Sequence, residues 1–245
     1  METVLITGAA RRVGSLIAEN LAENGCFVWV HYRTHEQDAR ELVKRIREKG
    51  GQADCVYADL ESPADIDKML SIITDSANGN LTTVIHNASI FLKGRLTTTS
   101  VADWDRVMNV NLRAVWYLSS RFYEHFPTAK RIITIGDASV VSAYSEHAAY
   151  GLSKYALKYL NEQMAVAFAP DIRVNLISPG MVLQGDGEPE AVWNRRNSRT
   201  LTDNQKSVES IQQAIRFLMS DPGMTGSELV ADNGLQLYCK NQRIE

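Results

Sequence analysis

The sequence of 245 residues has few cysteines, no long apolar run and no large excess of either charge. No stretch approaches the roughly 20 consecutive apolar residues that a membrane-spanning helix needs. The three cysteines, Cys26, Cys55 and Cys239, form no C-x-x-C pair, so we expect reduced thiols, with Cys26 and Cys55 in or beside buried strands. A formal net charge of −3 argues against a surface that binds nucleic acid or an anionic membrane.

Other signals are missing as well. The sequence shows no internal repeat, no low-complexity linker and no spacing of His, Cys, Asp or Glu that suits zinc or calcium. Strand-forming sequence begins at residue 3 or 4, which leaves no room for a signal peptide, so we expect a cytoplasmic protein without a bound metal. With 44% hydrophobic and 22% charged residues, residues 1–245 are expected to form one α/β domain.

The opening stretch, residues 4–14, has the pattern of a buried strand, a tight turn and the start of a helix. Gly8 supplies the turn and Gly25 ends the helix, whose apolar positions are Val13, Leu16, Ile17 and Leu21. Such a turn directs backbone N–H groups and the positive end of the helix dipole to one spot, which suits a pyrophosphate. Gly8 and Gly14 are also consistent with a turn that binds nothing.

The second strand, residues 27–32, runs into Arg33-Thr34-His35. A fold that prefers NAD carries a carboxylate near this point to hold the ribose 2′-hydroxyl, yet no acid occurs here before residue 36. A guanidinium and a hydroxyl instead suit a 2′-phosphate, so we predict NADPH over NADH. The alternative is that Arg33 is a solvated loop charge. Asp59, after the third strand, is expected either to meet the adenine or to cap the next turn.

Strand and helix patterns alternate along the whole chain. Strands are expected at 4–7, 27–32, 54–58, 81–86, 131–135, 172–177 and 228–231, and helices at 13–24, 36–49, from the Ser62-Pro63 cap, 102–125, 150–168 and 208–219. The alternation predicts a doubly wound Rossmann-type parallel sheet with helices on both faces, which binds ligands at the carboxyl ends of its strands. Residues 181–203 are polar and show no period, so we interpret them as a substrate-binding loop.

Tyr150 and Lys154 are four residues apart on a predicted helix, so their side chains share one face. A free phenol titrates near 10, which is too high for acid catalysis at neutral pH. A cation about 4 Å away would lower the phenol pKa by roughly three units, and we therefore expect Tyr150 to act as a proton donor. The alternative is a surface pair with no catalytic role.

The order of these pieces resembles the short-chain dehydrogenase/reductase family over nearly the whole chain. The matching pieces are Thr7-Gly8 with Gly14, Asn87-Ala88, Asn111, Tyr150 with Lys154, and Pro179-Gly180. The resemblance implies a nicotinamide cofactor, Tyr150 as proton donor, Lys154 on the nicotinamide ribose and Asn111 in support of a water-linked proton path. It also implies a homotetramer, for which the helices at 102–125 and 150–168 are candidate interfaces.

Three departures from the usual family pattern point to one branch. Arg12 stands where the family usually has glycine, and His86-Asn87-Ala88-Ser89 stands where it has Asn-Asn-Ala-Gly. Asp137 stands thirteen residues before Tyr150, at the usual place of the catalytic serine. With Phe91, these residues resemble the pteridine reductases, and residues 31–35 and 86–89 resemble the bacterial dihydromonapterin reductases in particular.

Each departure has a physical interpretation. A carboxylate at 137 can accept from the N–H donors of a pterin, or pass a proton through Tyr150 to a ring nitrogen. Phe91 is expected to stack on the flat ring, Arg12 to reach both the cofactor phosphates and the substrate edge, and Ser89 to bind the cofactor. The residues that we expect to contact NADPH are Gly8, Arg11, Arg12, Val13, Gly14, Tyr32, Arg33, Thr34, Asp59, Asn87, Ala88, Ser89, Tyr150, Lys154, Pro179 and Gly180.

The sequence thus predicts an NADPH-dependent pteridine reductase that acts on dihydromonapterin or dihydrobiopterin, with dihydrofolate as a secondary substrate. Several alternatives stay open. Asp137 is also a candidate N-cap, with Ser139 as the usual hydroxyl, while Phe91 is also a candidate core aromatic and His86 is favoured as a packed strand-end residue. The alternative functions are a carbonyl reductase, such as a 3-oxoacyl carrier-protein reductase, and a non-catalytic NADP(H)-sensing protein.

Overall fold

The computed structural model describes residues 1–185, 187–202 and 207–237. Within these residues, seven parallel strands form one sheet in the order β3-β2-β1-β4-β5-β6-β7. The strands are β1 (Thr3–Ile6), β2 (Phe27–Tyr32), β3 (Gln52–Tyr57), β4 (Thr83–His86), β5 (Arg131–Ile135), β6 (Arg173–Pro179) and β7 (Glu228–Ala231). The predicted doubly wound sheet is confirmed. Because the strand order reverses between β1 and β4, the loops after these two strands diverge and leave a crevice at their carboxyl ends.

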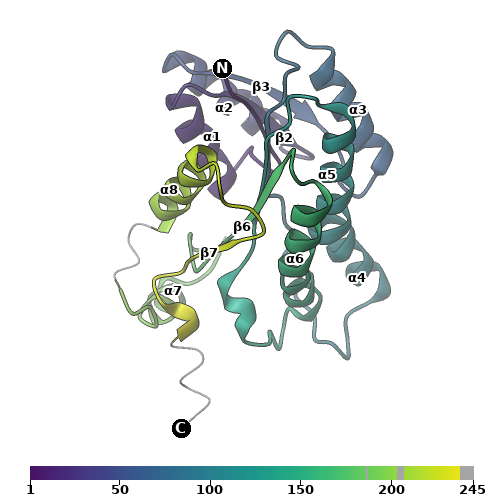
Figure 1. The fold of residues 1–245 in the computed structure, drawn as a ribbon. Coiled ribbons are helices and arrows are strands. Elements are labelled where there is room, and N and C mark those ends of the chain that lie inside the picture. The colour runs from purple at the N-terminus through teal and green to yellow at the C-terminus, as the bar shows by residue number, and fades with distance from the viewer. Residues whose placement is uncertain (186, 203–206, 238–245) are drawn as a thin grey trace.

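Helices cover both faces of the sheet (Figure 1). On one side lie α1 (Arg12–Glu23), α2 (Glu36–Glu48) and α8 (Ser207–Ser220), and on the other lie α3 (Pro63–Thr74), α5 (Ala114–His125) and α6 (Ala148–Ala167). Successive residues of a strand point to opposite faces. In β1, Leu5 therefore packs in the core beneath α3, α5 and α6, whereas Val4 and Ile6 pack beneath α1, α2 and α8.

Local signals set the ends of the helices. The Ser62 hydroxyl accepts from the backbone N–H of Asp65 at 3.2 Å, and Pro63 occupies the first position of α3, as the sequence predicted. Gly25 ends α1 with a φ of 83°, a conformation that costs glycine little. Among the described residues, no helix is both long and apolar enough to cross a bilayer. Cys26 is buried and Cys55 half-buried, both as free thiols, and Cys239 lies outside the described residues.

The long helix predicted at 102–125 consists of three consecutive pieces. These are α4 (Val101–Met108), a π-helical turn (Asn109–Arg113) and α5. The wider turn carries the buried side chain of Asn111, whose amide accepts from the N–H of Ile90 at 2.8 Å. The same amide donates to the carbonyl of Ile90 at 3.0 Å and to the hydroxyl of Ser153 at 3.1 Å. Asn111 therefore ties the chain after β4 to α6.

The segment predicted as an irregular loop, residues 181–203, contains a helix. This helix, α7 (Glu190–Asn197), was not predicted from the sequence. None of its residues is buried, so it has no apolar stripe from which a helical period could be recognised. Its signals are electrostatic instead, because Glu190 lies in the first turn and Arg195 and Arg196 lie in the last, which complements the helix dipole.

Candidate functional site

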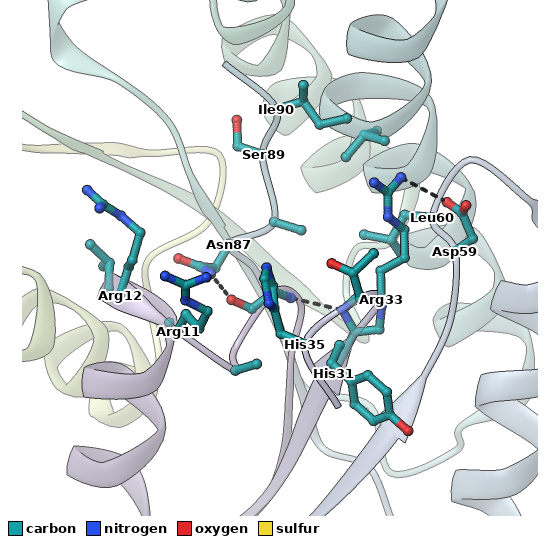
Figure 2. Close-up of a pocket in the computed structure, with 18 residues that line it drawn as sticks. Arg11, Arg12, His31, Arg33, His35, Asp59, Leu60, Asn87, Ser89 and Ile90 are labelled. Atoms are coloured by element: carbon teal, nitrogen blue, oxygen red, sulfur yellow. Dashed lines mark hydrogen bonds and ion pairs between the residues drawn. The ribbon is translucent and has the colours of Figure 1, made fainter. Parts of the chain in front are cut away.

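A cavity of about 460 Å³ opens at the carboxyl ends of the central strands (Figure 2). It is lined by Gly8, Ala10, Arg11, Arg12, Val13, Gly14, His31, Tyr32, Arg33, Thr34, His35, Asp59, Leu60, Asn87, Ala88, Ser89, Ile90 and Val110. The structure thus brings together every residue that the sequence analysis expects at the cofactor, except Tyr150, Lys154, Pro179 and Gly180. Pro179 ends β6, and Gly180 follows it next to Asp232.

The turn after β1 is built so that only glycine fits at two positions. Gly8 has a φ of 62°, and a Cβ there would lie 3.0 Å from the Cα of Ala88. A Cβ on Gly14 would lie 2.5 Å from the carbonyl oxygen of Gly8 and 2.6 Å from the Asn87 amide nitrogen. This close packing leaves the backbone of the turn open to the cavity, as a bound pyrophosphate requires.

Hydrogen bonds fasten this turn to the end of β4. The hydroxyl of Thr7 accepts from the backbone N–H groups of Asn87 and Ala88, each at 3.0 Å. The side-chain amide of Asn87 donates to the carbonyl oxygens of Thr7 at 2.9 Å and Gly8 at 3.1 Å. Thr7 and Asn87 therefore fix the two loops that flank the crevice.

His31 holds the same turn from the side of β2, a role that the sequence analysis missed. Its Nδ1 accepts from the backbone N–H of Gly8 at 2.9 Å, and its Nε2–H donates to the carbonyl of Ala58 at 3.1 Å. Burial lowers the pKa of His31 to about 4, so the imidazole is neutral near pH 7. A histidine within an apolar strand was the only signal available, because both partners are backbone atoms.

Arg12 adopts a left-handed backbone with a φ of 55°, which accounts for the glycine that the wider family carries at this position. Such a conformation costs a non-glycine residue roughly 1–2 kcal/mol. The Arg12 guanidinium donates to the carbonyl of Gln184 at 3.0 Å. The side chain thus joins the glycine turn to the segment at 181–203.

Charged residues surround the outer end of the cavity (Figure 2). The guanidinium of Arg33 lies 3.2 Å from Glu61 and 3.8 Å from Asp59, so Arg33 is not a lone solvated charge. Asp59 accepts from the N–H of Glu61 at 2.9 Å, so it caps the turn and also lines the cavity. Arg11 and His35 both lie beside Asp38, at 3.7 and 3.5 Å.

A second group of side chains converges on Asp137, directly after β5. Its Oδ1 accepts from the backbone N–H of Ser139 at 2.7 Å and so caps the short 3₁₀ turn (Ala138–Val141). Its Oδ2 accepts from the hydroxyl of Tyr150 at 2.8 Å and from that of Tyr144 at 2.9 Å. Both sequence interpretations of Asp137 therefore apply, since it is an N-cap and it also contacts Tyr150.

The prediction that Lys154 lowers the pKa of Tyr150 was wrong. The ammonium of Lys154 donates to the carbonyl of Ile135 at 2.7 Å and lies 6.0 Å from the centre of the Tyr150 ring. Burial, followed by the charge of Asp137, raises the pKa of Tyr150 above its usual value. Burial lowers the pKa of Lys154 to about 8, although Asp137 opposes this shift. The phenol therefore remains protonated at neutral pH.

Phe91 is not a core aromatic, since 54% of its surface is exposed. The imidazole of His147 stacks on its ring at 3.8 Å, and the ring of Tyr150 meets it edge to face at 4.6 Å. His147 Nδ1 donates to the carbonyl of Leu92 at 2.9 Å, and the chain at Gly94 pairs with His147 in a short parallel bridge. Phe91, His147, Tyr144 and Tyr150 thus form one aromatic cluster. The sequence analysis missed His147 and Tyr144.

His86 is a packed strand-end residue, as the sequence analysis favoured. Its Nε2 lies 2.9 Å from the hydroxyl of Ser119, and burial lowers its pKa to about 3. Among the described residues, no group of three or more His, Cys, Asp or Glu side chains is arranged to hold a metal ion.

Comparison with known proteins then assigns the family. A family model described as enoyl-(acyl carrier protein) reductase matches residues 8–236, which is most of the chain. The chain belongs to the short-chain dehydrogenase/reductase family. Members of this family are NAD(P)-dependent oxidoreductases, and the chain is one of them.

Three relatives illustrate the range of similar proteins. The 3beta-hydroxysteroid dehydrogenase 1 of Eggerthella lenta is 29% identical over 97% of this chain and 94% of its own length. The dihydromonapterin reductase of Klebsiella pneumoniae is 28% identical over 96% of each chain. The crystal structure of FolM alternative dihydrofolate reductase 1 from Brucella canis, complexed with NADP, has a TM-score of 0.87 and 29% identity, and covers 96% of this chain and 94% of that one. Steroid and pterin enzymes are thus equally similar to the chain.

The neutral state of His31 predicts a loss of stability in acid. The unfolded chain binds a proton on this residue below about pH 6.5, whereas the folded protein does so only near pH 4. We therefore expect His31 to contribute about 3 kcal/mol of unfolding free energy above pH 6.5, and this contribution to be lost progressively down to pH 4. Urea unfolding at several pH values measures how the free energy of unfolding changes with pH.

In His31→Gln, the free energy of unfolding should fall by about 3 kcal/mol less between pH 6.5 and pH 4 than it does in the wild type. His125→Gln, at an exposed position, is the control and should keep the slope of the wild type. Equal slopes in His31→Gln and the wild type would contradict the assignment of a neutral buried imidazole.

Proposed function

We propose that the protein is an NADPH-dependent reductase of a pteridine C=N bond, with dihydromonapterin, dihydrobiopterin and dihydrofolate as candidate substrates. The observation that carries this proposal is the hydrogen bond from the Tyr150 hydroxyl to Asp137 beside the exposed ring of Phe91. A carboxylate suits a heterocycle with N–H donors, whereas a carbonyl substrate offers only an acceptor. The similarity to a dihydromonapterin reductase and to an alternative dihydrofolate reductase supports the same substrate class.

The cavity fits a dinucleotide phosphate. The bare backbone at Gly8 and Gly14 would hold the pyrophosphate, and the side chains of Arg33 and Thr34 line the part of the cavity where a 2′-phosphate would bind. Lys154 would hold the nicotinamide ribose. The chemistry that NADPH supplies when bound is the transfer of a hydride to the ring carbon of the C=N bond. The NADP in the related FolM structure supports this choice of cofactor.

The side chains of Asp137 and Tyr150 bind the substrate and supply the proton. In the proposed reaction, the substrate donates an N–H to Asp137, and Tyr150 gives its hydroxyl proton to the ring nitrogen as the ring carbon is reduced. The raised pKa of Tyr150 means that its hydroxyl is protonated at neutral pH and so carries the proton that this step needs. The Phe91 ring orients the planar substrate and keeps water from one side of it.

The second candidate is a carbonyl reductase, because a 3beta-hydroxysteroid dehydrogenase is as similar to the chain as the pterin enzymes are. In that reaction Tyr150 would protonate a carbonyl oxygen. Asp137 has no hydroxyl to donate to that oxygen, and the side chain of Ser139, the alternative donor, hydrogen-bonds Tyr144. The present arrangement therefore favours the C=N substrate.

We also propose that four copies of the chain assemble. Large apolar side chains lie exposed on two neighbouring helices, with Trp116 on α5 50% exposed and Tyr159 on α6 66% exposed. Together they border an open groove of about 440 Å³. Exposed aromatic patches of this kind are typical of protein interfaces, and a second copy of the chain presents the same apolar surface.

Cofactor preference is tested by Arg33→Ala. Loss of one charge-assisted contact to the 2′-phosphate should weaken NADPH binding by roughly 10–100-fold, since such hydrogen bonds contribute about 1.5–3 kcal/mol. Binding of NADH should change by less than about threefold. Arg40→Ala, which removes an exposed arginine paired with Glu36 on α2, is the control. Fluorescence titration measures both dissociation constants, and a parallel loss of NADH binding would refute the 2′-phosphate role.

The substrate class is tested by NADPH oxidation with dihydromonapterin, dihydrobiopterin, dihydrofolate and an acetoacetyl thioester. We expect turnover with a pterin, and Tyr150→Phe should lower kcat by about 10²–10⁴-fold. Asp137→Ser should lower pterin turnover and Ser139→Ala should not. Reduction of the thioester alone would exclude the pterin proposal, and full pterin activity in Asp137→Ser would exclude the carboxylate role.

Assembly is tested by sedimentation equilibrium. The wild type should sediment at four times the 27.3 kDa mass of one chain. Tyr159→Glu should yield smaller species because it places a charge in the apolar surface. The control is Val101→Glu, an exposed position at the start of α4. A wild type that sediments as one chain would disprove the proposal.

A further inference from the structure

One carboxylate oxygen of Asp137 accepts hydrogen bonds from two tyrosine hydroxyls. The proton transfer proposed above uses only the hydroxyl of Tyr150. Tyr144 donates to Oδ2 at 2.9 Å, beside the bond from Tyr150 at 2.8 Å. The two rings lie 5.7 Å apart at an interplanar angle of 78°, so neither hydroxyl blocks the other. Tyr144 was not among the expected site residues, and its hydroxyl is also hydrogen-bonded by the Ser139 side chain.

The ring of Tyr144 is held firmly in this position. It packs against the buried cluster of Val107, Ala149 and Tyr150, and it lies over the first turn of α6. A Cβ on Gly151 would lie only 3.1 Å from the ring carbon Cδ2 of Tyr144, so the glycine leaves the space that the ring needs. Burial raises the pKa of the Tyr144 hydroxyl, which therefore stays a donor.

Counting acceptor sites shows what this second phenol achieves. An ionised carboxylate offers about four lone-pair positions. Three donors already occupy Asp137, namely the N–H of Ser139 and the hydroxyls of Tyr144 and Tyr150. About one position is left for a donor from a substrate. When Tyr150 turns its proton to a substrate, Tyr144 still donates to Oδ2. Without Tyr144, Oδ2 would depend on the N–H of the substrate alone, and an unpaired charged oxygen in a partly buried site is costly.

We propose that Tyr144 is a positioning residue of this site, which keeps Asp137 Oδ2 hydrogen-bonded while Tyr150 delivers its proton to the substrate. The inference rests on the proposed function, since it assumes that Tyr150 is the proton donor. It predicts that Tyr144 acts through Asp137 and on the rate of the chemical step. It does not require Tyr144 to touch the substrate or the cofactor.

The test is Tyr144→Phe, which keeps the packed ring and removes only the hydroxyl. We expect kcat to fall about tenfold, since the lost bond to a charged group then raises the barrier. The KM values for NADPH and for the substrate should change by less than about twofold. Tyr117→Phe is the matched control, because the Tyr117 hydroxyl also donates to a carboxylate, that of Asp67, at 2.8 Å. Tyr117 lies on α5 and Asp67 on α3, whereas Asp137 follows β5. Tyr117→Phe should leave kcat unchanged.

A double-mutant cycle separates positioning from a general structural role. In an Asp137→Ala background, Tyr144→Phe should alter kcat by less than about twofold, because the oxygen that accepts the Tyr144 hydroxyl is already absent. An equal tenfold loss in both backgrounds, or a loss that follows a fall in melting temperature, would overturn the inference. So would full activity in Tyr144→Phe.

The cycle is run with whichever of dihydromonapterin, dihydrobiopterin, dihydrofolate and the acetoacetyl thioester the wild type reduces. Reduction of the thioester only would refute the pterin proposal and still decide the role of Tyr144. Reduction of none of the four compounds by the wild type would count against both proposals.

Discussion

In the proposed reaction, the carboxylate of Asp137 is the constraint on which the chemistry depends. It accepts one backbone N–H and two phenol hydroxyls, and these bonds join the end of β5, the 3₁₀ turn and α6. A charge in a partly buried place is stable only with such partners. Together with burial, the Asp137 charge raises the pKa of Tyr150, whereas the sequence led us to expect that Lys154 would lower it. In the proposed reaction, Asp137 thus keeps Tyr150 in the protonated form that a proton donor needs.

The scaffold places this group and the cofactor cavity at one edge of the sheet. All seven described strands are parallel, so their carboxyl ends meet there. Thr7, Asn87 and His31 fix the glycine turn from two sides, and the Lys154 ammonium anchors α6 to the last residue of β5. The tightly packed glycines and the buried histidine therefore serve the same purpose, which is to hold an exposed backbone in a fixed shape.

Much of this arrangement could be predicted from the sequence, because it rests on local patterns. Short runs of strand-forming residues predicted β2, β5 and β7 with the bounds that the structure gives. The residues around Gly8, Arg33 and Asn87 all line the predicted cavity. In contrast, α7 has no apolar stripe, and the partners of His31 and His147 are backbone atoms far along the chain. The spacing of Tyr150 and Lys154 indicated a shared helix face, but it could not show that Asp137 is the nearer charge.

The central claim is that Asp137 binds a planar N–H donor next to Phe91. Its most direct test is a crystal structure of the protein with NADP and a non-reducible pterin analogue. We expect the analogue to lie against the Phe91 ring, with a ring N–H within hydrogen-bond distance of an Asp137 oxygen and the Tyr150 hydroxyl near a ring nitrogen. An analogue that binds elsewhere, with Asp137 still contacted only by Ser139, Tyr144 and Tyr150, would contradict it.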